Sequence, residues 1–121
     1  MPTILCVDDE PTQIILLDFA FKRAGFTVVC AHNGQEAVEL ARRHHPDIIL
    51  MDLMMPVKDG ASATADLKAI PSLADTPIIL FTAYETGDLA RKALAAGAQE
   101  IISKTTPPAK LVSKINQALG R

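Results

Sequence analysis

The sequence has no tryptophan, a single tyrosine and two cysteines, and neither sign of charge dominates it. Cys6 and Cys30 lie in apolar stretches with no further Cys or His at metal-ligand spacing, so we expect both to be small buried hydrophobic residues. The formal net charge of -2 lacks the basic excess that binding a phosphate backbone requires. Direct nucleic-acid binding is therefore not expected.

Long hydrophobic runs and long polar tracts are also missing. No apolar run approaches the length of a membrane span, and the chain opens on a strand-like run, so we expect no membrane insertion and a cytoplasmic location. With 49% hydrophobic residues, the chain can bury enough apolar surface to fold. Its 121 residues suit one domain, residues 1–121, without a separate output or catalytic domain.

Short aliphatic runs alternate with amphipathic segments along the whole chain. Five runs are predicted to be strands: Ile4 to Val7, Phe26 to Ala31, Ile48 to Met51, Ile78 to Thr82 and Gln99 to Ser103. Five helices are predicted: from Pro11 to a stop at Gly25, from a cap at Asn33 to just before Pro46, about Ala61 to Ile70, about Gly87 to Ala96, and about Pro108 to Leu119. This alternation predicts an α/β fold, a (βα)5 doubly wound parallel sheet.

The runs at 48–51 and 78–81 are continuously aliphatic, as in strands that helices cover on both faces. We expect the first, third and fourth strands at the centre of the sheet. In such sheets the functional site lies at the carboxyl ends of the strands.

Acidic side chains follow two of the predicted strands. Asp8 and Asp9 follow the first strand and Asp52 follows the third, so three carboxylates should converge at one edge of the sheet. Their mutual repulsion would weaken the fold without a counter-charge, which suggests a bound hard cation. Mg²⁺ is the best candidate, because it takes oxygen ligands from a few carboxylates and completes its shell with water and phosphate.

A hydroxyl and an ammonium are predicted at the same edge. Thr82 ends the fourth strand and Lys104 follows the fifth. Singly, a strand-end Asp is often a helix cap, a Thr is a common strand residue and a Lys is usually solvated. Together they supply what phosphoryl transfer needs, an acceptor oxygen in Asp52 and donors or positive charge for the phosphoryl oxygens.

These residues carry a family resemblance that covers essentially the whole chain. Val7-Asp8-Asp9-Glu10, Asp52 with Pro56 and Asp59-Gly60, Thr82-Ala83 and Lys104 resemble the bacterial receiver domain of two-component response regulators, of the chemotaxis-regulator type. The resemblance implies a flavodoxin-like receiver fold with strand order 2-1-3-4-5.

The resemblance also implies a function. Asp52 would accept a phosphoryl group from a sensor histidine kinase or a histidine phosphotransfer protein, and Thr82 and Lys104 would contact that group. The implied Mg²⁺ ligands are Asp8, Asp9, Asp52 and the backbone carbonyl of Met54. Receivers of this type are not conventional enzymes, although they promote their own aspartyl phosphorylation and dephosphorylation.

On activation, the family's Thr moves and reshapes the face made by the fourth helix, the fifth strand and the fifth helix. We therefore expect an unidentified downstream protein to bind there, and the resemblance allows a phosphorylation-dependent dimer.

Four positions modify this expectation. Ile101 stands where the family usually has the aromatic switch residue, and Thr105 follows Lys104 where it usually has Pro. Met54 and Tyr84, two positions beyond Asp52 and Thr82, are predicted to flank the path of hydrolytic water. Because Met cannot orient water and a Tyr ring can cover the phosphoryl group, we expect slow dephosphorylation.

Two other functions share part of this residue pattern. An aspartate-nucleophile phosphatase of the haloacid dehalogenase type needs a second Asp two positions after the nucleophile, where this chain has Met54, and it needs room for a cap domain. A receiver-like interaction module that is not phosphorylated is favoured by Ile101 and by the Lys104-Thr105 pair. Phosphorylation of Asp52 by a small donor distinguishes this module from the switch.

Overall fold

The five predicted strands form one parallel sheet in the order β2-β1-β3-β4-β5, which confirms the strand order that the resemblance implies. The computed structural model describes all residues from 1 to 121. Its strands are β1 (Thr3–Val7), β2 (Thr27–Ala31), β3 (Ile48–Met51), β4 (Ile78–Thr82) and β5 (Glu100–Ser103). Its helices are α1 (Pro11–Arg23), α2 (Gly34–His44), α3 (Gly60–Lys68), α4 (Asp88–Ala96) and α5 (Pro108–Ala118), with a 3-10 turn, η1 (Pro71–Leu73), after α3.

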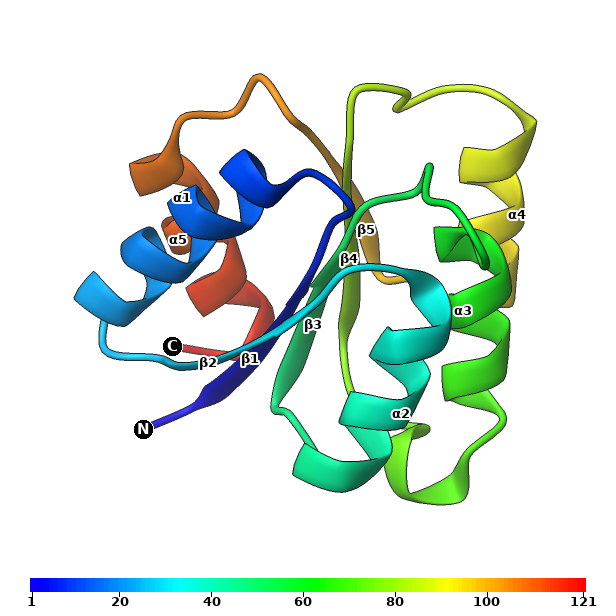
Figure 1. Ribbon diagram of the computed structural model, residues 1–121, viewed down its shortest axis with the longest axis horizontal. Coiled ribbons are helices and arrows are strands. Elements are labelled where there is room, and N and C mark those ends of the chain that lie inside the picture. The colour runs from blue at the N-terminus through cyan, green and yellow to red at the C-terminus, as the bar shows by residue number, and fades with distance from the viewer.

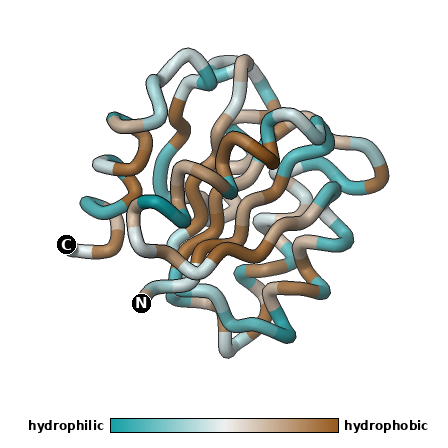
Figure 2. Tube along the Cα trace, turned by 60° about the vertical axis from the view of Figure 1, so that its left-hand side comes forward, coloured by the Kyte–Doolittle hydropathy of each residue, from teal (hydrophilic) through white to brown (hydrophobic).

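Helices cover both faces of the sheet, with α1 and α5 on one side and α2, α3 and α4 on the other (Figure 1). Alternate residues of each central strand enter opposite cores. In β1, Leu5 packs towards the α2–α4 side and Cys6 towards the α1–α5 side. Figure 2 shows the strands as the most hydrophobic part of the chain. The continuous aliphatic runs are therefore explained, because both faces of β1, β3 and β4 are buried.

Helix boundaries follow local capping chemistry. The Asn33 side chain accepts a hydrogen bond of 2.9 Å from the Glu36 N–H, which confirms the predicted cap of α2. The Asp59 side chain caps α3 in the same way through the Ser62 N–H at 2.8 Å. This cap starts α3 at Gly60, one residue earlier than predicted.

The predicted end of α3 at Ile70 was too late. The helix ends at Lys68, and Ile70 has an extended conformation with φ -85 and ψ 116. The ring of Pro71 disfavours a helical conformation for the residue before it, and this proline opens the 3-10 turn η1.

The two cysteines lie side by side, because β1 and β2 pair in a register that places Cys6 opposite Cys30. Cys6 is fully buried, as predicted, but Cys30 is only partly buried because β2 is an edge strand. Burial raises the pKa of both thiols, which disfavours their thiolate forms at neutral pH.

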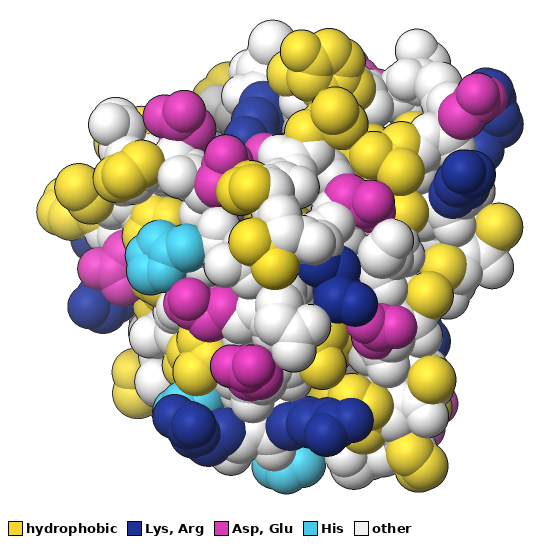
Figure 3. All heavy atoms as spheres, turned by 45° about the vertical axis from the view of Figure 1, so that its right-hand side comes forward, with side chains coloured by type: hydrophobic (Ala, Val, Ile, Leu, Met, Phe, Trp, Pro, Cys, Tyr) yellow, Lys and Arg dark blue, Asp and Glu magenta, His cyan; other side chains and the backbone are white.

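The surface carries charges of both signs. In Figure 3, basic and acidic side chains are interspersed over the face that is shown. On α1, the large apolar residues Ile15, Leu16 and Phe19 are exposed although Ile14, Leu17 and Phe21 are buried. None of the helices combines the length and the apolar character needed to cross a membrane.

Candidate functional site

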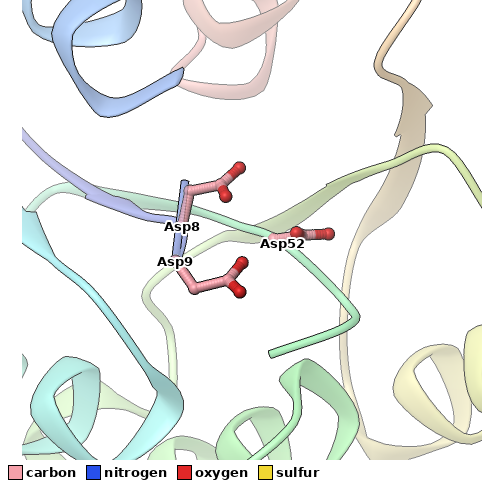
Figure 4. A group of neighbouring side chains, drawn as sticks. All are labelled: Asp8, Asp9 and Asp52. Carbon is pink, nitrogen blue, oxygen red and sulfur yellow. The ribbon is translucent and has the colours of Figure 1, made fainter. Parts of the chain in front are cut away.

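The three predicted carboxylates meet at the carboxyl ends of β1 and β3. Asp8 continues β1, where its N–H donates to the Ala31 carbonyl at 3.1 Å, and the Asp52 N–H donates to the Val7 carbonyl at 2.9 Å. Carboxylate oxygens of Asp8, Asp9 and Asp52 all lie within 4.8 Å of one another. In Figure 4 the three carboxylates extend to the same side of their strands. These backbone hydrogen bonds between neighbouring strands therefore fix the positions of Asp8 and Asp52.

Lys104 joins this cluster from the far end of the chain. Its ammonium donates to Asp8 Oδ2 at 2.7 Å and to Asp52 Oδ2 at 3.0 Å. Asp8 is 1% exposed and Asp52 is 7% exposed, so both carboxylates are largely removed from water. The sequence predicted Lys104 at this edge, but not its bond to Asp8.

Thr82 lies at the same edge of the sheet, at the end of β4, but it does not bond to Asp52. Its side chain is buried, and its hydroxyl oxygen accepts a hydrogen bond of 3.1 Å from the Tyr84 N–H. Its carbonyl accepts a bond of 2.9 Å from the Lys104 N–H, which ties β4 to the segment after β5. The Thr82 hydroxyl thus stabilises the start of the loop that leads to α4.

Burial and charge have opposite effects on the pKa of Asp52. Burial raises the pKa of Asp52, and the hydrogen bond and charge of Lys104 only partly offset this effect, while Asp8 adds to it. For Lys104, burial lowers the pKa, but the hydrogen bonds to Asp8 and Asp52 outweigh it, so its pKa is raised. The ammonium is therefore charged at neutral pH and attracts anions.

The remaining positions singled out in the sequence surround this cluster. Met54 and Tyr84 are exposed, and the Met54 N–H lies 3.4 Å from Asp52 Oδ1 as a long hydrogen bond. Ile101 is partly buried and packs against the core on the α2–α4 side. The bond between Lys104 and Thr105 is trans, since the chain contains no cis peptide bond.

The donor set fits a hard divalent cation. One ammonium faces three carboxylates, and Asp9 is exposed, with no hydrogen bond and no ion pair to another group of the chain. Negative charge therefore exceeds positive charge at the site, and every side-chain donor in the cluster is oxygen. A negatively charged set of ligands that offers only oxygen atoms suits Mg²⁺.

Two features were missed in the sequence: the tight packing of two glycines, one of them the Gly60 of the Asp59-Gly60 pair, and the exposed apolar residues of α1. Gly34 and Gly60 each lie so close to another segment that a side chain would collide with its backbone. Their ordinary φ angles leave no local signal, because the reason is a tertiary contact. The exposed apolar residues of α1 did carry a signal, since Ile15 and Leu16 are out of phase with the buried stripe at 14, 17 and 21.

Comparison with known proteins identifies one family over nearly the whole chain. Residues 4–116 match the response regulator receiver domain. Regulatory protein AtoC of Escherichia coli (strain K12) is 41% identical over 101 residues, a stretch that covers 84% of this chain and 22% of AtoC. The chain thus spans about a fifth of the length of this relative.

Solved structures agree with this match. The receiver domain of the sensor histidine kinase PA1611 from Pseudomonas aeruginosa PAO1, with a magnesium ion coordinated in its active site cleft, has a TM-score of 0.92 at 31% identity, covering 99% of this chain and 98% of that one. The BeF3-activated receiver domain of Klebsiella pneumoniae RstA has a TM-score of 0.87 at 32% identity, covering 98% and 99%.

The raised pKa of Asp52 predicts a pH-dependent cost in stability when divalent cations are absent. Below the ordinary value near 3.8 the carboxyl is protonated in both the folded and the unfolded chain, so the cost is absent. The cost in stability grows as pH rises from about 3.8 through the higher pKa that Asp52 has in the folded chain. In EDTA at pH 7, Asp52→Asn should therefore unfold at a higher temperature than wild type, and the difference should shrink towards pH 4.

Thermal unfolding followed by circular dichroism measures this difference. Glu85→Gln removes the same charge from an exposed position and serves as the control, with no change expected. A wild type that is the more stable protein at pH 7 would mean that the attraction of Lys104 outweighs the burial of Asp52.

Proposed function

The chain belongs to the response regulator receiver domain family, and we propose that it is a phosphorylation-controlled signalling switch whose phosphoryl acceptor is Asp52. The observation that carries this proposal is a buried Asp52 carboxylate within hydrogen-bond distance of Lys104 and beside two further carboxylates. The donor is a phosphohistidine on a sensor kinase or a phosphotransfer protein. Receivers are signalling modules and not conventional enzymes; this chain promotes its own phosphorylation and dephosphorylation.

In the proposed transfer, an oxygen of Asp52 attacks phosphorus as the nitrogen–phosphorus bond of the phosphohistidine breaks, and the imidazole leaves and takes up a proton. Lys104 offers an ammonium to the phosphoryl oxygens from its place beside Asp52. The Thr82 hydroxyl then gives up its bond to Tyr84 and donates to the phosphoryl group. When bound, Mg²⁺ neutralises charge on the phosphoryl oxygens, and its holders would be Asp8, Asp9, Asp52 and the Met54 carbonyl.

The proposed output follows from the movement of Thr82. Because the Tyr84 N–H would lose its acceptor, the loop between β4 and α4 must rearrange. Ile101 has no aromatic ring to rotate, so the change would reach the face of α4, β5 and α5 through loop and helix shifts. A downstream protein, or a second copy of the chain in a phosphorylation-dependent dimer, would bind that face.

An apolar groove between α1 and α5 suggests where the phosphodonor docks. One hollow of about 300 Å³ is lined by Leu16, Phe19, Ala20 and Val112, among others. A second hollow of about 170 Å³ shares Leu16, Ala20 and Pro108 with it and reaches Lys104. Since this groove runs from exposed apolar residues to the acceptor site, we propose that an amphipathic helix of the protein bearing the phosphohistidine lies in it.

The exposed residues beside the acceptor bear on the lifetime of the phosphorylated form. Met54 is 50% exposed and Tyr84 is 62% exposed, so both side chains are free to cover a phosphoryl group. Neither places a small polar group where it could orient an attacking water. We therefore propose that Asp52 phosphate hydrolyses slowly.

Acceptor chemistry is tested with acetyl phosphate and with beryllofluoride, each in the presence of Mg²⁺. We expect a phosphoryl mass increase that maps to Asp52, and stabilisation of about 2.7 kcal/mol when beryllofluoride is at a hundred times its Kd. Asp52→Asn should show neither effect. Absence of both effects in the native chain would favour the interaction module that is not phosphorylated.

Docking in the groove is tested with the double variant Leu16→Glu, Phe19→Glu. Transfer from an autophosphorylated sensor kinase, identified from a panel of purified kinases, should slow by at least about tenfold, because burying two carboxylates costs more than about 1.4 kcal/mol. Phosphorylation by acetyl phosphate should not change, since a small donor needs no groove. Equal slowing with both donors would exclude the groove as a docking site.

Slow hydrolysis is tested by removing the small donor and following decay of the phosphorylated chain. The double variant Met54→Asn, Tyr84→Glu should decay about tenfold faster than wild type, a change that needs only about 1.4 kcal/mol at the barrier. The two single variants, Met54→Asn and Tyr84→Glu, show how much each side chain contributes to the decay rate. Equal decay, or faster decay in wild type, would exclude shielding and leave the acceptor assignment intact.

A further inference from the structure

The first residue of α2 touches the loop that follows the phosphoryl acceptor. The Gly34 N–H donates to the carbonyl oxygen of Lys58 at 3.1 Å. A Cβ atom on Gly34 would lie 2.3 Å from that oxygen and 3.0 Å from the Lys58 carbonyl carbon. Gly34 does not have a positive φ, so its conformation alone does not require glycine. The requirement is space for the backbone of the loop.

Of the two segments in contact, α2 is the more firmly held. The Asn33 cap fixes its first turn through the 2.9 Å bond to Glu36, and Ala37 and Ala41 are fully buried beneath it. The loop from Asp52 to Asp59 is more exposed, with Val57 81% accessible. Any collision at Gly34 would therefore displace the loop and not the helix.

The loop needs this support because its turn is strained. Val57 has a φ of 69, a conformation that a β-branched residue rarely adopts. The Lys58 N–H bonds back to the Pro56 carbonyl at 2.7 Å across this turn. Such a conformation persists only when the surrounding structure holds it, and the contact with Gly34 is adjacent to it.

Movement of the loop would be confined to the residues nearest the metal-binding edge. At its start, the Leu53 carbonyl accepts a bond of 2.8 Å from the Gly60 N–H, and Leu53 is 1% exposed. Gly60 itself is wedged, since a Cβ there would lie 2.5 Å from the Asp52 carbonyl oxygen. With both ends of the loop fixed in this way, displacement of Lys58 must be absorbed by residues 54–57.

We propose that Gly34 is a positioning residue of the acceptor site, which sets the β3–α3 loop and, through it, the Met54 carbonyl for Mg²⁺ binding. A residue outside the acidic cluster, on a helix that carries none of its ligands, thus controls metal affinity. The role of the Met54 carbonyl as a Mg²⁺ ligand and the link from metal binding to phosphorylation both rest on the function proposed above. The loop contact itself does not depend on that function.

Gly34→Ala tests the proposal by three measurements. Mg²⁺ titration by calorimetry should show a Kd at least about tenfold weaker than wild type. The amide signals of the metal-free variant should shift mainly at residues 54–59. Phosphorylation by acetyl phosphate should slow at low Mg²⁺ and recover to within about threefold of wild type at saturating Mg²⁺, since the acceptor carboxylate is unchanged.

Two matched controls separate positioning from general destabilisation. Gly25→Ala places a side chain at a φ of 93 with no atom within 4 Å, so it should lower the unfolding temperature without changing Mg²⁺ affinity. Lys58→Ala removes the ion pair to Asp66 but keeps the carbonyl and Cβ that meet Gly34. It should not weaken Mg²⁺ binding by more than about twofold, since removing a positive charge cannot repel the cation.

The outcomes distinguish this inference from the proposed function. If wild type is not phosphorylated, the proposed function fails, while the Mg²⁺ titration and the amide signals still decide the role of Gly34. Unchanged affinity with unchanged loop signals in Gly34→Ala, or an equal loss in Lys58→Ala, would overturn the inference. If Gly34→Ala does not fold, Asn33→Ala decides instead: the inference requires weaker Mg²⁺ binding from a loosened first turn, and wild-type affinity would overturn it.

Discussion

The bonds of one ammonium to two buried carboxylates are the interaction on which this structure depends. Lys104 follows the last strand of the chain, yet it bonds to Asp8 after the first strand and to Asp52 after the third. In the order β2-β1-β3-β4-β5, this bond spans the sheet from β5 to β1. It forms only when the intervening strands are in register, so the chemistry of the site also reports that the sheet is correctly assembled. Because Lys104 supplies only one positive charge to an edge with three carboxylates, that edge can bind a further cation.

Burial of the Asp52 carboxylate lowers the stability of the fold, but the proposed function requires that carboxylate. An apolar residue at position 52 would avoid the cost of burying a carboxylate, but it could not accept a phosphoryl group. Burial raises the pKa of Asp52 despite the neighbouring ammonium. The aliphatic cores on both faces of the sheet offset this cost, with β1, β3 and β4 buried almost throughout. The helices on both faces of the sheet thus supply the apolar burial that compensates for the buried carboxylates.

The sequence predicts the parts of this protein that depend on local pattern. Aliphatic runs give the strands to within a residue, and Asn33 gives the start of α2. The strand order came from family resemblance, because periodicity does not determine which strands are neighbours. The meeting of the acidic residues and Lys104 at one edge was predictable, but the individual bonds and close packing between distant segments were not. The bond from Lys104 to Asp8 joins residues 96 positions apart, and the fit of Gly34 against Lys58 leaves no trace in backbone angles.

The segments around the carboxyl edge of the sheet differ in how firmly they are held. On one side, side chains cap α2 and α3, and two glycines are wedged against the backbone of the acceptor loop. On the other side, α4 starts at Asp88, and Gly87 before it provides no side-chain cap; a Cβ at Gly87 would have no atom within 4 Å. A segment with few contacts rearranges at lower cost than one held by caps and close packing. In the proposed switch, charge added at Asp52 would therefore meet less resistance in the β4–α4 loop than in α2 and α3. The bond from the Tyr84 N–H to the Thr82 hydroxyl lies at the start of this second loop, so movement of Thr82 in the proposed switch would act first on the segment that leads to α4.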